Sequence, residues 1–106
     1  MPDLLVVLMT APSQDVAETI VSSLVTEQLI ACGNITTPVT SIYRWRGSIE
    51  HASEVLVVMK TTVAGFDALE QRVRELHPYD VPELVALSAE KSLDAYARWV
   101  VDSVKS

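Results

Sequence analysis

The apolar positions of this chain fall into short runs and helical stripes, which predict alternating strands and helices. Leu4 to Met9 is a continuous apolar run, as expected for a strand buried on both faces. Pro12 and Ser13 end this run, and the Ser13 side chain can cap the helix that follows. From Gln14 to Leu29 the apolar residues recur at helical spacing, which predicts the first helix.

A long extended segment follows, and it is the unusual feature of the pattern. From Ile35 to Arg46 the residues alternate with period two and are rich in β-branched types, which predicts a strand. Pro38 within it indicates a bulge or an edge position. Gly47 can take positive φ in a turn at 46–48, and Ile49 to Thr61 then runs back as a second strand.

Two further helices and a short strand complete the pattern. The second helix, Gly65 to Leu76, should end near His77, because Pro78 disfavours a helical residue before it. Leu84 to Leu87 is a short apolar strand, and Ser92 can cap a last helix. The residues expected on the inner face of that helix are Leu93, Tyr96, Ala97, Val100 and Val104. The order β-α-β-β-α-β plus a C-terminal helix predicts an α+β fold of the ferredoxin-like, split βαβ type.

The predicted hairpin from Ile35 to Thr61 is too long for the domain that carries it. Typical strands have about five or six residues, and each of these is roughly twice that. Its distal part, 43–50, should therefore project beyond the helices, and an exposed strand edge calls for a partner. Tyr43 and Trp45 are of types enriched at interfaces. Self-association explains this most simply; the alternative is a tip folded back on its own sheet.

Composition narrows the class of protein. A length of 106 residues predicts one domain, 1–106, and no apolar run approaches the roughly 18 residues of a membrane span. The formal charge of −6, with eight Lys and Arg, disfavours nucleic-acid binding. No basic stretch precedes the first apolar run, which argues against a signal peptide. The single cysteine, Cys32, cannot form an internal disulfide, so we expect the reducing cytoplasm.

A stiff loop contains the first candidates for chemistry. His77 and Glu83 flank a segment with Pro78 and Pro82, and they could act as metal ligands or as a base and its orienter. The alternative is structural: His77 caps the second helix while Glu83 pairs with a basic side chain. Met9 ends the first strand, where core packing competes with a role as a soft ligand for Cu(I).

A second set of candidates lies on the hairpin. Glu54 and Lys60 share one face of its second strand, and Tyr43 and Trp45 should line the neighbouring strand. Together they could form a pocket at a subunit boundary, or a salt bridge that fixes the register between subunits. No GxSxG, P-loop, GxGxxG or zinc-ligand spacing is present. We therefore predict no enzyme, and acid–base catalysis by His77 with Glu83 remains a minority alternative.

Five segments in order and spacing resemble the CutA family of divalent-cation tolerance proteins over essentially the whole chain. They are Thr10-Ala11-Pro12, Ala31-Cys32-Gly33-Asn34-Ile35, Ser41-Ile42-Tyr43-Arg44-Trp45-Arg46-Gly47, Glu54 with Lys60-Thr61-Thr62, and His77-Pro78-Tyr79 with Pro82-Glu83. The resemblance implies a cytoplasmic homotrimer with a ferredoxin-like protomer, similar to the PII signalling proteins. It also implies binding of divalent cations, chiefly copper, and a role in metal tolerance, the response to metal ions or signalling.

One departure from the family pattern concerns the metal. The family's copper-binding pattern has a Cys at the end of the first strand and two consecutive His before Pro-Tyr, whereas this chain has Met9 and Leu76-His77. The resemblance therefore leaves His77 and Met9 as the expected ligands, and copper binding is expected to be weak. Two alternatives stay open. One is an intersubunit cleft for a small molecule, formed by Tyr43, Trp45, Glu54, Lys60, His77 and Glu83. The other is a scaffold trimer that presents its surface to a partner protein.

Overall fold

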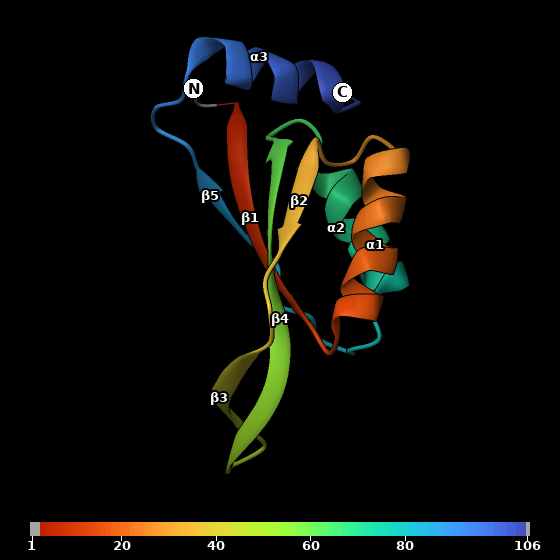
Figure 1. Ribbon diagram of the computed structural model, residues 1–106, viewed down its shortest axis with the longest axis vertical. Helices are drawn as coiled ribbons and strands as arrows, with labels where there is room; N and C mark the ends of the chain where they lie inside the picture. The colour runs from red at the N-terminus through yellow and green to blue at the C-terminus, as the bar shows by residue number, and fades with distance from the viewer. Residues whose placement is uncertain (1–2, 106) are drawn as a thin grey trace.

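The computed structural model describes residues 3–105 as an antiparallel sheet with two helices on one face and a third across its end (Figure 1). The elements in chain order are β1 (Leu4–Ala11), α1 (Gln14–Thr26), β2 (Cys32–Ile35), β3 (Val39–Trp45), β4 (Ser48–Thr62), α2 (Phe66–Leu76), β5 (Val85–Ser88) and α3 (Asp94–Ser103).

The sheet has the strand order β2-β4-β1-β5, and β3 pairs with the outer half of β4. Every pairing is antiparallel. The long β4 spans 15 residues, so its inner half pairs with β1 and β2 while its outer half carries β3. This confirms the predicted α+β, ferredoxin-like arrangement with a long hairpin and an extra C-terminal helix.

The main core lies between one face of the sheet and the helices α1 and α2. Successive strand residues point to opposite faces, and along β1 the odd-numbered residues Leu5 to Ala11 turn toward these helices. Met9 and Met59 are fully buried there, packed with Leu24 of α1 and Leu69 of α2. Burial of such side chains stabilises the fold by about 1.5–3 kcal/mol each.

The opposite face of the sheet is largely uncovered within one chain, and we call it the open face. Its apolar residues are Val6, Leu8, Leu56, Val58, Val85 and Leu87. The helix α3 covers only its end, where Leu4 packs with Val100 and Val104 (Figure 1). The prediction that the first strand is buried on both faces is therefore wrong for a single chain.

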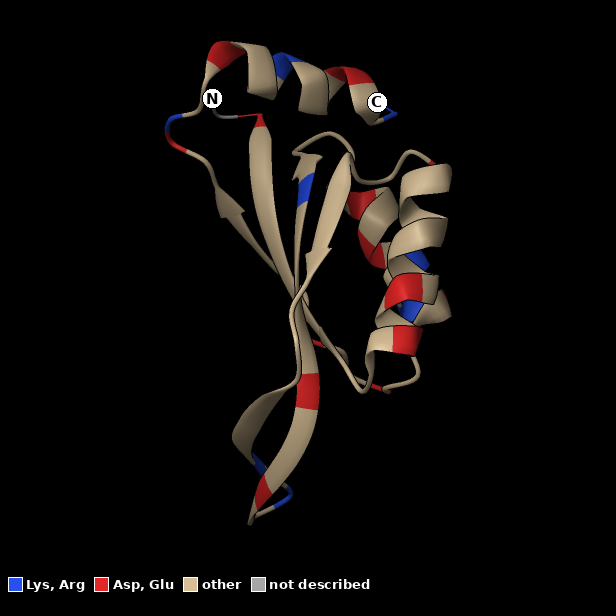
Figure 2. Cartoon of the chain, in the orientation of Figure 1, with Lys and Arg blue, Asp and Glu red and all other residues tan. Residues whose placement is uncertain are grey.

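Charge is sparse on the strands that build this face, where Lys60 of β4 pairs with Val6 and Cys32. Neither β1, β2 nor β5 contains an acidic or basic residue, and charged positions lie mainly on the helices, the loops and the hairpin (Figure 2). The predicted short strand at 84–87 is observed as β5, one residue later, yet all four of its residues are exposed. A largely apolar surface of this kind marks an interaction site.

The hairpin projects from the body as predicted. Its first arm is interrupted at residues 36–38, which include Pro38. This break separates β2 from β3. Arg46 and Gly47 both take positive φ, 51° and 84°, which is the geometry of a type I′ turn. Residues 42–50 are all exposed, so the alternative of a tip folded back on its own sheet is wrong.

Helix ends differ from the predictions in two places. Ser13 does cap α1, because the Val16 amide donates to its Oγ at 3.2 Å, but the helix ends at Thr26 and Gln28 takes a φ of 61°. Ser92 does not cap α3, since Leu93 occupies the N-cap position and the Ser92 hydroxyl donates to the Leu93 carbonyl. Leu93 is exposed rather than on the inner face. Tyr96 is 37% exposed, but its hydroxyl contacts Cys32 of the sheet, while Ala97, Val100 and Val104 are buried. None of the helices described over residues 3–105 is long and apolar enough to cross a membrane.

Candidate functional site

A cavity of about 530 Å³ lies at the base of the hairpin, between β3, β4 and the loop that joins α2 to β5. Four residues predicted for a ligand cleft line it: Tyr43, Trp45, Glu54 and Glu83. Its other lining residues are Thr10, Ser41, Ile42, Tyr79, Asp80 and Val81. The volume is within the range of small-molecule sites, which is about 300–1,000 Å³.

Glu54 and Tyr79 form a part-buried hydrogen bond in the wall of the cavity. The Tyr79 hydroxyl donates to Glu54 Oε2 at 2.7 Å, and only 7% of the surface of residue Glu54 is exposed. Burial, and then the hydrogen bond to this carboxylate, raise the pKa of Tyr79 above its ordinary value. Tyr79 was not among the predicted site residues. The available signal was its place between Pro78 and Pro82 in a stiff loop.

His77 holds this loop against the end of β1. Its Nε2–H donates to the Thr10 carbonyl at 2.7 Å, and its Nδ1 accepts the backbone N–H of Tyr79 at 3.2 Å. These two bonds require the neutral imidazole with its proton on Nε2. Because both ring nitrogens are engaged, neither offers a free lone pair to a metal in this conformation. The His77 backbone amide, not its ring, closes α2 through the Val73 carbonyl at 2.8 Å.

Met9 and Glu83 lie in different surroundings from His77. Met9 is fully buried in the core under α1 and α2, although it is adjacent in sequence to Thr10, which the His77 ring contacts. Glu83 is exposed at the cavity, and no hydrogen bond or ion pair joins it to His77 or to a basic side chain within residues 3–105. The same residues contain no group of three or more His, Cys, Asp and Glu arranged to hold a metal ion.

Lys60 is separated from the cavity. It pairs across the sheet with Val6 and Cys32, and its Nζ donates to Asn34 Oδ1 at 3.0 Å. Glu54 lies six residues earlier on the same strand, which corresponds to roughly 20 Å at about 3.3 Å per residue. Lys60 can therefore join this cavity only from another copy of the chain.

Cys32 lies near the end of the open face, next to α3. Its Sγ is 3.6 Å from the Tyr96 hydroxyl, and this contact raises the pKa of Tyr96. The thiol is partly exposed and belongs to no group of three or more metal-type ligands among the described residues. The geometry fits a packed small side chain better than a reactive site.

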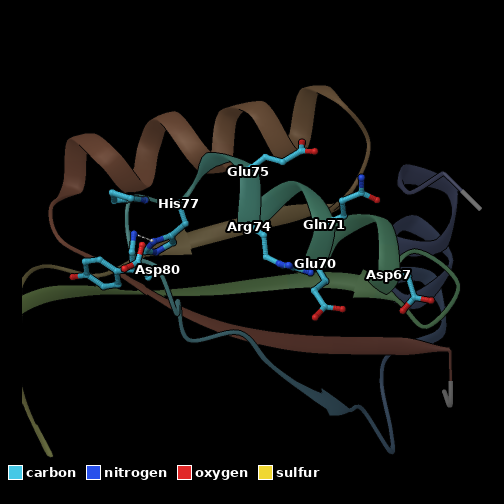
Figure 3. Close-up of a pocket in the computed structure, with 9 residues that line it drawn as sticks. Asp67, Glu70, Gln71, Arg74, Glu75, His77 and Asp80 are labelled. Atoms are coloured by element: carbon cyan, nitrogen blue, oxygen red, sulfur yellow. Dashed lines mark hydrogen bonds between the residues drawn. The ribbon is translucent and has the colours of Figure 1, made fainter. Parts of the chain in front are cut away.

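A second, polar groove runs along α2 and meets the cavity at Tyr79 and Asp80. Figure 3 shows the acidic side chains Asp67 and Glu70 on this helix, Arg74 between the acidic groups, and His77 and Asp80 at its C-terminal end. Acidic residues outnumber basic ones here, in keeping with the net charge of −6. Such a surface repels anions.

Comparison with known proteins gives consistent matches. Residues 5–103 match the family model described as CutA1 divalent ion tolerance protein. The chain is 48% identical over 95 residues to the divalent-cation tolerance protein CutA of Thermus thermophilus, covering 90% of this chain and 92% of that protein. It is 43% identical to the human protein CutA over 91 residues, which are 86% of this chain but only 51% of the human one.

Solved structures of the same family also match the fold of this chain. The solved structure of the divalent cation tolerance protein Cut A1 from Thermus thermophilus superposes with a TM-score of 0.94 at 45% identity. The match covers 96% of this chain and 99% of that one. The likeness therefore extends through the hairpin and all three helices.

The Tyr79–Glu54 contact predicts a pH dependence of stability. The fold raises the pKa of Tyr79, so the folded chain keeps the phenolic proton after the unfolded chain releases it near pH 10. This contribution is fully present below about pH 10 and is lost as pH rises toward the folded pKa. Urea unfolding between about pH 8 and about pH 11 should show a shallower alkaline loss of stability in Tyr79→Phe than in the wild type.

Tyr43→Phe is the matched control for this measurement. Tyr43 lines the same cavity but is 43% exposed, and no hydrogen bond to its hydroxyl is found within residues 3–105. It should retain the alkaline slope of the wild type. Equal slopes in the wild type and in Tyr79→Phe would contradict the assignment of Tyr79.

Proposed function

The chain belongs to the family of CutA1 divalent ion tolerance proteins, and from this premise we propose that it acts as a homotrimer that binds divalent cations, copper among them. In this role it serves metal tolerance and the response to metal ions, with a PII-like signalling architecture and without catalysis. The single cysteine and the resemblance support placing it in the cytoplasm.

The observation that carries the proposed assembly is the open face. Val85 and Leu87 are 47% and 52% exposed, beside the half-buried Leu8 and Val6 with which they pair. Covering apolar surface stabilises an assembly by roughly 25 cal/mol per Å². Three copies arranged around a closed ring can cover all three open faces at once, leaving none exposed. The projecting hairpin supplies a further strand edge for a neighbour.

The proposed copper site consists of His77 with Met9, and the geometry supports only weak binding there. A metal must displace either the Thr10 carbonyl from Nε2 or the Tyr79 amide from Nδ1. It must also draw the Met9 thioether out of the core, where it has no exposed surface. Each lost hydrogen bond costs about 1 kcal/mol, which subtracts from the binding free energy.

A second candidate function is the binding of a small-molecule effector in the cavity. The observation that favours it is the convergence of aromatic and carboxylate side chains on a hollow of about 530 Å³. The remaining alternative is a scaffold trimer that presents its surface to a partner protein. It is less well supported, because it gives the cavity no role.

The assembly can be tested by light scattering on the purified chain at micromolar concentration. The wild type should have three times the chain mass of 11.6 kDa. Val85→Glu puts a charge on the open face, where burial costs several kcal/mol per charge. It should raise the dissociation concentration on the order of a hundredfold or more.

Val25→Glu provides the matched control, because Val25 is 41% exposed on α1, away from the open face. It should leave the mass unchanged. A monomeric wild type would overturn the proposed trimer. Equal dissociation concentrations for the two variants, measured over the same dilution series, would remove the open face from the interface.

Copper binding can be tested by calorimetry with Cu(II), and with Cu(I) under reducing conditions. We expect weak binding that His77→Ala lowers at least about tenfold, since it removes the one nitrogen ligand. The other histidine of the chain, His51, lies on the exposed hairpin, and the His51→Ala variant should bind copper as the wild type does. His77→Gln retains a donor for the Thr10 carbonyl and separates loss of a ligand from loss of fold. Unchanged titrations in His77→Ala would remove His77 from the site.

A further inference from the structure

The cavity at the base of the hairpin has a one-sided chemistry. Its lining combines the aromatic side chains Tyr43, Trp45 and Tyr79 with carboxylates at Glu54, Asp80 and Glu83. None of the lining residues found within 3–105 is Lys or Arg. Aromatic ring faces and carboxylates both attract cations, so all the charged and aromatic side chains of the lining favour a ligand with positive charge.

Glu54 is the decisive residue of this lining. It is more than nine-tenths buried, and its partner is the neutral Tyr79 hydroxyl, which uses Oε2. Within residues 3–105 no hydrogen bond to Oε1 and no ion pair to Glu54 is found. No side-chain oxygen of the described residues is both buried and unpartnered, so Oε1 is open to solvent where Glu54 lines the cavity. Its position in the wall of an open cavity means that a cation entering there would complete the pair.

The same lining argues against an inorganic ion and against an anion. A divalent metal needs several ligand atoms within about 2.0–2.6 Å of one point, and no such group of His, Cys, Asp and Glu is found in the described chain. Phosphate groups need Lys, Arg or a cluster of backbone amides, and the lining offers three carboxylates instead. A hollow of about 530 Å³ also greatly exceeds a single ion.

Trp45 already interacts with a cation in this structure. The Arg46 guanidinium carbon lies 5.5 Å from the centre of the Trp45 ring, within the distance of a cation–π interaction. Arg46 is at the turn of the hairpin and does not line the cavity. The indole at this position is therefore electron-rich and accessible enough to hold positive charge.

We propose that the cavity is a binding site for a small organic cation that carries an alkylammonium group. Tyr43 and Trp45 offer ring faces to it, and Glu54 and Glu83 supply the opposite charge. This goes beyond metal tolerance: it gives the small-molecule alternative a ligand class and rests on it. The competing occupant is the Lys60 ammonium of another copy, which is the same chemistry supplied by the protein itself.

Calorimetry with choline and with its neutral isostere 3,3-dimethylbutan-1-ol tests the proposal. The two probes have the same shape and differ in charge. Choline should bind the wild type at least about tenfold more tightly than the isostere. Equal affinities would reveal an apolar hollow without preference for charge, and no binding of choline would also overturn the proposal.

Matched variants locate the site. Trp45→Leu should weaken choline binding about 3- to 30-fold, whereas Trp99→Leu on α3 should not, although both indoles are 46% exposed. Glu54→Gln and the exposed Glu83→Gln should each weaken it several-fold, and Glu18→Gln on α1 should not. Circular dichroism of each variant verifies the fold. Wild-type affinity in Trp45→Leu and in both cavity Gln variants would overturn the assignment.

Lys60→Met separates the free site from the competing occupant. Unchanged choline binding in this variant supports a cavity that is open to a free ligand. Binding that occurs only in Lys60→Met would overturn the proposal, because Lys60 of a neighbouring copy would then fill the cavity. Light scattering and copper titration on the same samples keep the proposals apart. If the chain is a copper-binding trimer that does not bind choline, only the proposed organic-cation site is overturned. If it is a monomer that binds choline, only the proposed assembly is overturned.

Discussion

A β-strand turns alternate side chains to opposite faces of its sheet, and in this chain both sets are largely apolar along β1 and the inner half of β4. The helices α1 and α2 both lie on one face, and α3 reaches only the end of the other (Figure 1). One face therefore builds a complete core within the chain. The other is also largely apolar, although Lys60 lies on it, and most of it is left without a cover.

The hairpin and the cavity depend on the length of β4. Because β4 continues beyond β1, its outer half projects with β3 and forms one wall of the hollow, and the loop after α2 forms the other. His77 fixes that loop through Thr10 and Tyr79, so its ring works as a structural clamp in this conformation. The clamp places Tyr79 against Glu54 and thereby shapes the wall. A proposed assembly through the open face would bring neighbouring chains close to the same cavity.

Local patterns in the sequence were enough to predict most of the fold. The run at Leu4, the helix end enforced by Pro78 and the positive φ of Gly47 each follow from properties of a few adjacent residues. The exposure of β5 could not be predicted this way, because an apolar run does not reveal whether its cover belongs to the same chain. The N-cap of α3 was misplaced by one residue, because the Ser92 hydroxyl donates to the Leu93 carbonyl instead of accepting from an amide of the helix.

The site was less predictable than the fold. Tyr43, Trp45, Glu54 and Glu83 do line one cavity. Strand alternation fixes the shared face of the first three, whereas Glu83 comes from the loop before β5. The partners of His77 and the role of Tyr79 depend on contacts across 67 and 25 positions, which no local pattern encodes. The separation of Lys60 from Glu54 follows from their spacing on one strand, and only a second chain could bring them together.

The central claim is that other copies of the chain cover the open face. Side-chain footprinting with hydroxyl radicals tests this claim most directly. In the assembled wild type, Leu87 and Val85 should react as slowly as fully buried core residues such as Leu69, although each is about half-exposed in a single chain. Val25 on α1 should react at the rate of an exposed residue. Reaction of Leu87 and Val85 at the rate expected for half-exposed side chains would contradict the claim that other copies cover this face.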